Sequence, residues 1–180
     1  MLNLHKYNPK YAELFQIESI KLNKILNNIC FVEHIGSTAI PGVDGKGVID
    51  IMLVFNNRTD MESAIGLLNN AGYFSSADNT KRNGRIFMSS TGVKESGEGD
   101  IHLHLLTKDN DDYSQVIMFR NYLIKHQDAK QLYIDLKYEL FEKVNGDRKE
   151  YTKLKGVFIK NIINLAQNDK TQSHNQTKQH

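Results

Sequence analysis

The segment Val48–Phe55, VIDIMLVF, constrains the fold more than any other part of the chain. Side chains of a strand point alternately to its two faces, so a strand with one wet face shows alternating polarity. This segment is apolar at both parities apart from Asp50, a pattern typical of a central strand covered on each side. A carboxylate inside such a strand is costly unless it is paired, hydrogen-bonded or bound to a metal. The segment therefore predicts a covered sheet and a partner for Asp50.

A loop of small residues precedes this strand. Residues 30–36, CFVEHIG, show the alternation of another strand, and residues 36–47, GSTAIPGVDGKG, contain four glycines and one proline. Two interpretations of Asp50 follow. In the first, it is a cation ligand beside a loop that accepts phosphate. In the second, it is satisfied internally, by an ion pair with Lys46 or by hydrogen bonds to loop amides.

Regularly spaced apolar residues predict the helices around this strand. Asn8 and Pro9 are typical of a helix start, since Asn caps a first turn and the first turn tolerates Pro. The residues that follow form one apolar stripe at helical spacing, namely Leu14, Phe15, Leu22, Ile25, Leu26 and Ile29. A second, shorter helix is expected to begin at a Thr59 cap and to end near Asn70.

Residues 100–106, DIHLHLL, alternate strictly and predict another strand. Because strand side chains alternate between faces, Asp100, His102 and His104 are expected to share one face of the sheet. The apolar residues between them are expected to share the other. A short strand is also expected within RIFMSS, residues 85–90.

The remainder of the chain has helical spacing. From Asp111 onward apolar residues recur at three, four or seven positions, with a break at Gly146. The residues expected to pack these helices are Phe119, Tyr122, Leu123, Leu132, Leu136, Leu140, Phe141, Tyr151, Leu154, Phe158, Ile162 and Leu165. No apolar residue follows Ala166, so a disordered tail is expected at 169–180. The sequence thus predicts an α+β fold, a mixed β-sheet flanked by helices with a helical C-terminal half, in a single domain over residues 1–168.

Composition excludes several classes of protein. The 180 residues carry 23 Lys and Arg against 21 Asp and Glu, a net charge of +2, which is too balanced to indicate a nucleic-acid partner. Polar residues interrupt the longest apolar runs, whereas a membrane-spanning helix needs about 20 mostly apolar residues. The N-terminus lacks the apolar core of a secretory signal, and the single Cys30 cannot form an internal disulfide. We therefore expect a cytoplasmic protein, whose oligomeric state the sequence does not specify.

Two levels of resemblance follow from these motifs. A Gly-Ser turn followed by an Asp in an apolar strand is similar to the nucleotidyltransferase superfamily of the polymerase-beta type. More narrowly, residues 34–51, HIGSTAIPGVDGKGVIDI, resemble the GrpB family of uncharacterised proteins, which also occurs fused to dephospho-CoA kinase. The segments HLHL at 102–105 and FRNYLIKH at 119–126 fit the same family, so the resemblance covers residues from about 7 to 166.

The superfamily resemblance implies in-line displacement at phosphorus, assisted by one or two Mg²⁺ ions. Two carboxylates at i and i+2 of one strand would hold the metals, with a third from a neighbouring strand, while the Gly-Ser turn approaches the triphosphate. This sequence departs from the pattern at i+2, where Met52 replaces a carboxylate, although Mg²⁺ prefers oxygen ligands. His102 and His104 suit Mn²⁺ or Zn²⁺ better.

The first hypothesis is a nucleotidyltransferase-like enzyme that binds a nucleotide or another phosphorylated small molecule and transfers a nucleotidyl group to an unknown acceptor. Asp50 and Ser37 would then be catalytic. The residues expected to bind phosphate are Gly36, Ser37, Thr38, Lys46, Arg85 and Arg120. The residues expected to hold a metal are Asp50, His102, His104 and Asp100.

Two other hypotheses belong to different classes. A catalytically degenerate module would bind a nucleotide or a CoA precursor without turnover, which Met52 and the family's occurrence beside a kinase both favour. A hydrolase would use Asp50, His102 and His104 to hold a metal that activates a water molecule.

Overall fold

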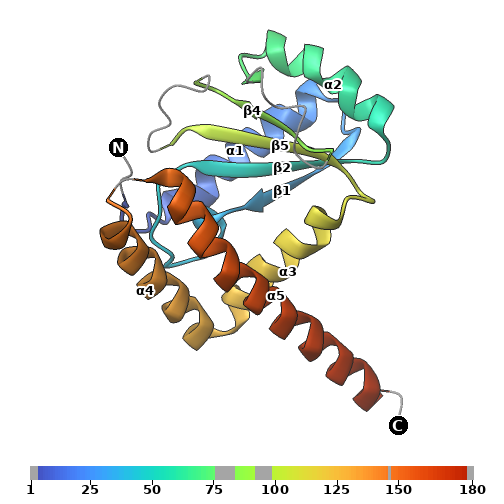
Figure 1. The fold of residues 1–180 in the computed structure, drawn as a ribbon. Coiled ribbons are helices and arrows are strands. Elements are labelled where there is room, and N and C mark those ends of the chain that lie inside the picture. Colours follow the sequence, from blue (N-terminus) through green and yellow to red (C-terminus); the bar gives the residue numbers. More distant parts are fainter. Residues whose placement is uncertain (1–3, 76–83, 92–98, 146, 178–180) are drawn as a thin grey trace. The chain divides into compact units, whose positions relative to one another are not determined.

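The computed structural model describes residues 4–75, 84–91, 99–145 and 147–177 of the chain (Figure 1). It divides into two compact units. The first, Leu4–Tyr113, contains the β-sheet, and the second begins at Ser114 and is helical. The single domain predicted over residues 1–168 stays a prediction.

The first unit has the α+β pattern that the sequence predicts. Its elements in chain order are α1 (Lys10–Ile25), β1 (Cys30–Ile35), the 3₁₀ turn η1 (Ser37–Ala39), β2 (Ile49–Phe55), α2 (Arg58–Asn70), β3 (Phe74–Ser75), β4 (Ile86–Ser89) and β5 (Ile101–Thr107). The second unit continues α3 (Asp111–Lys125) and adds α4 (Gln127–Lys143) and α5 (Arg148–Thr177).

The sheet is mixed and has the strand order β1-β2-β5-β4-β3. Strand β2 is antiparallel to β1 and parallel to β5, and β4 is antiparallel to β5. The parallel pair places Asp50 opposite His102 and Met52 opposite His104. The antiparallel pair places Phe87 opposite His104 and Ser89 opposite His102. Residues far apart in the sequence are therefore neighbours on one face of the sheet.

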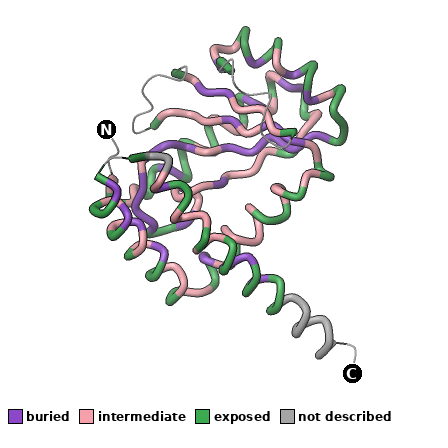
Figure 2. Tube along the Cα trace, viewed as in Figure 1, coloured by how far each residue is buried: buried purple, intermediate pink, exposed green. Residues whose placement is uncertain are grey.

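The other face of the sheet carries the main apolar core. Every residue of β2 except Asp50 is buried, as expected for a strand covered on both sides (Figure 2). The residues that pack this core from α1, α2 and the strands include Leu22, Leu26, Ile49, Ile51, Leu53, Phe55, Met61, Leu68, Leu103 and Leu105. Burial of one such side chain contributes about 1.5–3 kcal/mol, so this face fixes the orientation of β2 and β5. His102 and His104 of β5 are thereby directed to the opposite face, as predicted.

Asparagines define the starts of α1 and α2. The Asn8 side chain accepts a hydrogen bond from the Lys10 N–H at 3.0 Å, in line with its predicted capping role. The prediction of a Thr59 cap for α2 is wrong, because Asn57 has the extended backbone of an N-cap and accepts a hydrogen bond from the Asp60 N–H at 2.9 Å. Asn57 thus satisfies one of the free amides at the helix start, and Thr59 lies inside the helix.

The second unit buries fewer residues than its periodicity predicts. Leu140, Val144 and Tyr151 form an apolar cluster at the junction of α4 and α5. Two residues expected to pack are largely exposed, Leu132 at 60% and Leu165 at 48%. Helical spacing identifies a stripe, but the stripe is wider than the surface that neighbouring helices cover.

Helix α5 is longer than the sequence predicts. It continues to Thr177, past the last apolar residue, Ala166, and into the segment 169–180 predicted to be disordered. A helix bonds its own backbone internally and so needs no apolar face to remain hydrogen-bonded. In the described part of the chain, no helix is long and apolar enough to cross a membrane.

Candidate functional site

Asp50 lies against the Gly-Ser turn. Gly36 links β1 to η1 with a φ of 74°, a conformation that favours glycine. A Cβ atom at Gly36 would overlap Asp50 Oδ2 and lie 3.1 Å from Asp50 Cγ, so only a residue without a side chain fits there. The turn and the carboxylate therefore form one structure, in which Oδ2 faces the backbone of the turn.

Thr38 holds this turn to the strand that follows it. Its buried hydroxyl donates a hydrogen bond to the Val48 carbonyl at 3.0 Å and lies 3.1 Å from His34 Nε2. Because the single hydroxyl hydrogen goes to Val48, the His34 ring donates to Thr38. His34 in turn stacks on Phe15 of α1, with ring centroids 4.5 Å apart. Thr38, predicted to bind phosphate, has its hydroxyl committed to the loop, whereas Ser37 is half-buried at the start of η1.

Two histidines of β5 converge on the other oxygen of Asp50. His104 Nε2 lies 3.3 Å from Asp50 Oδ1, and His102 Nδ1 lies 3.4 Å from the same oxygen. One interpretation of the sequence gave Asp50 an internal partner, and the partners it proposed were Lys46 or loop amides. Among the described residues the partners of the carboxylate are the two histidines, and Lys46 is half-buried elsewhere in the loop.

The histidines keep Asp50 ionised. Burial alone would raise the pKa of the Asp50 carboxyl, but the hydrogen bonds from His102 and His104 and the electrostatic attraction of both rings outweigh it. The pKa of Asp50 is therefore held well below its usual value. The Asp50 side chain retains 27% exposure, so one part of this anionic group can be reached from outside.

Arg85 extends the cluster beyond the histidines. Its Nη2 lies 3.2 Å from His104 Nδ1, and its Nη1 forms a 2.9 Å ion pair with Asp112 Oδ2. Two interpretations of Arg85 follow from the sequence, a phosphate ligand or an ion-paired residue. The structure gives it an ion pair and a contact to the site at once, so Asp112, Arg85, His104 and Asp50 form one continuous polar chain.

Three residues of this neighbourhood were missed by sequence reasoning. Asp112 anchors Arg85, Phe87 packs its ring edge-on to His102 with centroids 4.9 Å apart, and Ser89 lies opposite His102 on β4. The Ser89 hydroxyl is buried and has no hydrogen-bond partner among the described residues. Alternation within IFMS places Phe87 and Ser89 on one face, but which strand they pair with could not be read from the sequence.

The donor set does not fit a pair of Mg²⁺ ions, the larger of the two numbers that the superfamily resemblance implies. Asp50 is the one carboxylate on its strand, because Met52 is fully buried and offers no oxygen. The positions opposite on β5 carry imidazoles, which are weak ligands for Mg²⁺. In the described ranges no group of three or more His, Cys, Asp or Glu side chains is arranged to hold a metal ion. Asp100, predicted as a metal ligand, contacts β2 through its backbone. Its carbonyl accepts a hydrogen bond from the Ile49 N–H at 2.8 Å.

Arg120 belongs to the second unit. It lies on α3, and its Nε donates a hydrogen bond to the Asn121 side chain at 3.0 Å. Its predicted role in phosphate binding stays a prediction.

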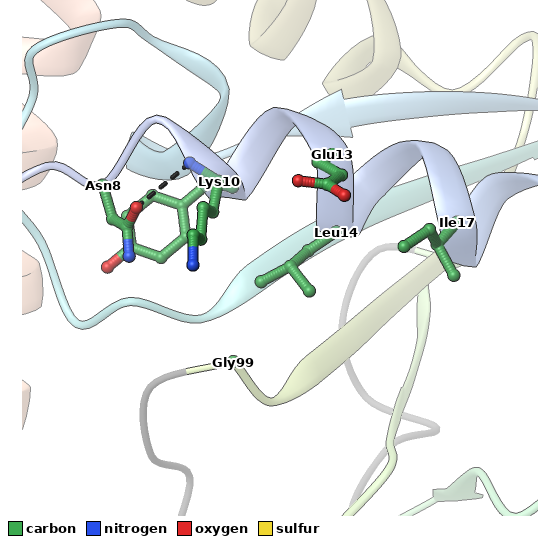
Figure 3. Close-up of a pocket in the computed structure, with 7 residues that line it drawn as sticks. Asn8, Lys10, Glu13, Leu14, Ile17 and Gly99 are labelled. Atoms are coloured by element: carbon green, nitrogen blue, oxygen red, sulfur yellow. Dashed lines mark hydrogen bonds between the residues drawn. The ribbon is translucent and has the colours of Figure 1, made fainter.

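A separate hollow lies on the N-terminal part of α1. The cavity measures about 520 Å³ and is lined by Asn8, Lys10, Tyr11, Glu13, Leu14, Ile17 and Gly99 (Figure 3). In Figure 3 Leu14 and Ile17 point from the helix toward the side on which Gly99 lies. None of the residues of the Asp50 cluster lines this cavity, and its lining combines an amine, a carboxylate and aliphatic groups without a shared chemistry.

Solved structures place this fold among nucleotidyltransferase-like proteins. The crystal structure of the conserved protein GrpB from Enterococcus faecalis matches with a TM-score of 0.76 and 28% identity, over 91% of this chain and 96% of that one. A crystal structure of the Cid1 poly(U) polymerase bound to MgGTP matches with a TM-score of 0.53 and 13% identity, over 76% of this chain and 44% of the polymerase. At that identity the second match shows the fold alone, and the chain spans less than half of the polymerase.

Sequence comparisons identify the family. A UPF0157 protein of Halalkalibacterium halodurans is 26% identical over 166 residues, which are 92% of this chain and 82% of the relative. A UPF0157 protein of Pseudomonas aeruginosa is 31% identical over 136 residues, 75% of this chain and 54% of the relative. The glutamate-rich protein GrpB of Alkalihalophilus pseudofirmus is 28% identical over 88% of this chain and 91% of its own length. The pattern that defines the GrpB protein family matches residues 1–165, and the chain therefore belongs to the GrpB family.

Proposed function

We propose that this protein binds a nucleotide or another phosphorylated small molecule at the face of the sheet formed by the Gly36–Ser37 turn, Asp50 and the histidines of β5. The phosphate groups lie against the turn, where the Ser37 hydroxyl and backbone amides are the donors. Lys46 and Arg85 supply positive charge from the loop and from the start of β4.

The observation that carries this proposal is the packing of Asp50 against Gly36. Asp50 Oδ2 lies so close to the Gly36 backbone that no side chain fits between them, so a ligand bound on the turn lies next to the carboxylate. An ionised carboxylate beside backbone amides attracts a ligand that brings its own cation or a hydroxyl donor next to its phosphates. The nucleotidyltransferase-like fold supports a nucleotide as the ligand, since a solved relative of this fold holds MgGTP.

Binding, rather than two-metal nucleotidyl transfer, is the function that the donor set favours. Met52 removes the second carboxylate of the superfamily pattern, and it is buried in the sheet face rather than directed to a ligand. A metal can still arrive with the nucleotide, because Mg²⁺ is often bound through the phosphates and one or two carboxylates. We therefore expect Mg²⁺ to strengthen nucleotide binding without being required for it.

Calorimetry tests the proposal. The full chain is titrated with ATP, GTP, CTP, UTP and dephospho-CoA, each in the presence of Mg²⁺ and again in EDTA. At least one of these ligands should bind, and Ser37→Ala should weaken that binding roughly tenfold, the effect of losing one hydrogen bond to a charged group. The matched control is Ser63→Ala, which removes a hydroxyl bonded to the Asp60 carbonyl on α2. Absence of heat with all five ligands in both conditions contradicts the proposal.

A further inference from the structure

We propose that His102 is a catalytic residue, whose Nε2 removes the proton from a hydroxyl group as that hydroxyl attacks a phosphorus atom of the bound ligand. This inference rests on the proposed function and adds a reaction to it. Asp50, His104 and Arg85 are positioning residues that fix which nitrogen of His102 carries its hydrogen.

The argument begins at Arg85, whose guanidinium can only donate hydrogen bonds. His104 Nδ1, 3.2 Å from Arg85 Nη2, must therefore be the acceptor of that bond. The hydrogen of the neutral His104 ring is then on Nε2, which faces Asp50 Oδ1 at 3.3 Å. His104 thus donates to the carboxylate, and the ion pair of Arg85 with Asp112 holds the arginine in place.

The same carboxylate oxygen sets the tautomer of His102. An ionised Asp50 only accepts hydrogen bonds, so the nitrogen facing it, Nδ1 at 3.4 Å, carries the hydrogen. This distance is long for a hydrogen bond, as is common for catalytic pairs before a substrate binds. The lone pair of the neutral ring is then on Nε2, the nitrogen on the far side of the ring. A carboxylate behind one nitrogen and a free lone pair on the other is the arrangement of a general base.

Packing fixes the orientation of the His102 ring, and a second polar group stands beside it. The edge-on contact with Phe87 holds the ring, and 21% of the His102 side chain remains exposed, so the ring is not sealed from a ligand. Ser89 lies directly opposite His102 on the neighbouring strand, where side chains of facing residues are about 4.5–5.5 Å apart at Cβ. Its hydroxyl is buried without a partner among the described residues, a costly state that a bound hydroxyl group would relieve.

The reaction is balanced without further reactants. The oxygen of a water molecule or an alcohol forms a bond to phosphorus while its proton passes to His102 Nε2. The bond from phosphorus to the leaving phosphate oxygen breaks, and the electron pair stays on that oxygen. Asp50 stabilises the imidazolium that forms, and His102 then returns its proton to the leaving phosphate or to solvent.

A first experiment tests the tautomers directly by long-range ¹⁵N–¹H correlation on the full chain. We expect the hydrogen of His102 on Nδ1 and that of His104 on Nε2. Asp50→Ala should shift His102 toward the opposite tautomer, a spectroscopic change that a merely structural role of Asp50 would not produce. His126, which lies 3.4 Å from Asp169 on the helical unit, is the internal reference and should not change. A hydrogen on Nε2 of His102 in the unaltered protein overturns the inference.

A second experiment follows turnover of the five ligands named above by ³¹P NMR, in water with and without glycerol as a small alcohol. His102→Asn retains a donor near the position of Nδ1 and removes Nε2, and we expect it to slow turnover by 10²–10⁴-fold, the usual contribution of a general base. Its calorimetric affinity should stay within about threefold of the unaltered protein. His126→Asn is the matched control and should be without effect. An unchanged rate in His102→Asn, or no turnover by a protein that binds ligand, overturns the catalytic role while the binding function stands; absence of binding overturns the proposed function itself.

Discussion

At the scale of single residues, Asp50 is held on two sides by different chemistry. Oδ1 receives the two imidazoles of β5, and Oδ2 lies against the backbone of Gly36. A carboxylate in a covered strand needs such partners, because an unpaired buried charge is strongly destabilising. The same contacts that stabilise Asp50 in the sheet also place it beside the turn, so stability and function are coupled at this residue.

Gly36→Ala should show how much the contact between Asp50 and the turn constrains the residue at position 36. A Cβ in the left-handed region costs roughly 1–2 kcal/mol, and overlap with Asp50 Oδ2 should add about 1–3 kcal/mol. Gly42→Ala is the control, since Gly42 also has a positive φ but nothing within 4 Å of the Cβ position. Urea unfolding should therefore show a larger loss for Gly36→Ala than for Gly42→Ala. Equal losses would mean that Asp50 does not pack against the turn.

Asp50 should also make stability depend on pH. Its pKa is lower in the folded chain than the unfolded value of about 3.9, so the unfolded chain binds the proton more readily. Stability from this group is fully present above the unfolded pKa and is lost as pH falls toward the folded pKa. The difference in unfolding free energy between the unaltered protein and Asp50→Asn should thus shrink between about pH 5 and pH 2. Glu62→Gln, an exposed carboxylate on α2, is the control, and a pH-independent difference for Asp50→Asn would contradict the expectation.

At the scale of secondary-structure elements, the start of α2 shows what a local pattern can and cannot specify. Both Asn57 and Thr59 are residue types that cap helices, and they stand two positions apart. The backbone conformation decides between them, because Asn57 is extended and its oxygen meets the Asp60 N–H.

Removal of the Asn57 cap should weaken the protein measurably. Asn57→Ala leaves the Asp60 amide without its partner and should cost about 1 kcal/mol, within a range of roughly 0.5–2 kcal/mol. Thr59→Ala should change stability by less than about 0.5 kcal/mol, because Thr59 lies inside the helix. Urea unfolding of both variants measures the two losses of stability. A larger loss for Thr59→Ala than for Asn57→Ala would mean that Thr59 is the cap, as the sequence predicts.

Elements were easier to predict than the contacts between them. The strand at Val48–Phe55 and the alternation of residues 100–106 could be read from the chain, since hydrophobic period is a local property. The metal hypotheses already grouped Asp50 with His102 and His104, but the register that sets His102 opposite Asp50 could not be read, because it depends on the parallel pairing of β2 with β5 across a long connection. For this reason the direct partner considered for Asp50 was Lys46, a neighbour in sequence, while the histidines entered only as fellow ligands of a metal. The bond from Arg85 to Asp112 was unreadable for the same reason.

At the scale of the whole molecule, the chain consists of a sheet unit and a helical unit, and all the polar groups of the Asp50 cluster belong to the sheet unit. The sequence predicts a single domain, which implies that the two units lose their structure together. A cooperative domain unfolds in one transition, whereas independent units give two. Ligand binding distinguishes these cases, because a ligand stabilises only the part of the chain whose folding it requires.

We expect one thermal transition that moves as a whole when a nucleotide binds. At a free ligand concentration of 100 times Kd, binding adds about 2.7 kcal/mol, and each kcal/mol raises Tm by about 2–4 °C in a chain of this length. Circular dichroism at 222 nm reports mainly the helices, and backbone infrared absorption reports the strands. If the two units unfold together, both signals should give the same shifted midpoint. Asp50→Ala should abolish the shift because it removes the group beside the turn. A strand signal that shifts while the helix signal stays fixed would show that the units unfold separately, and the predicted single domain would then be wrong even though the binding site is right.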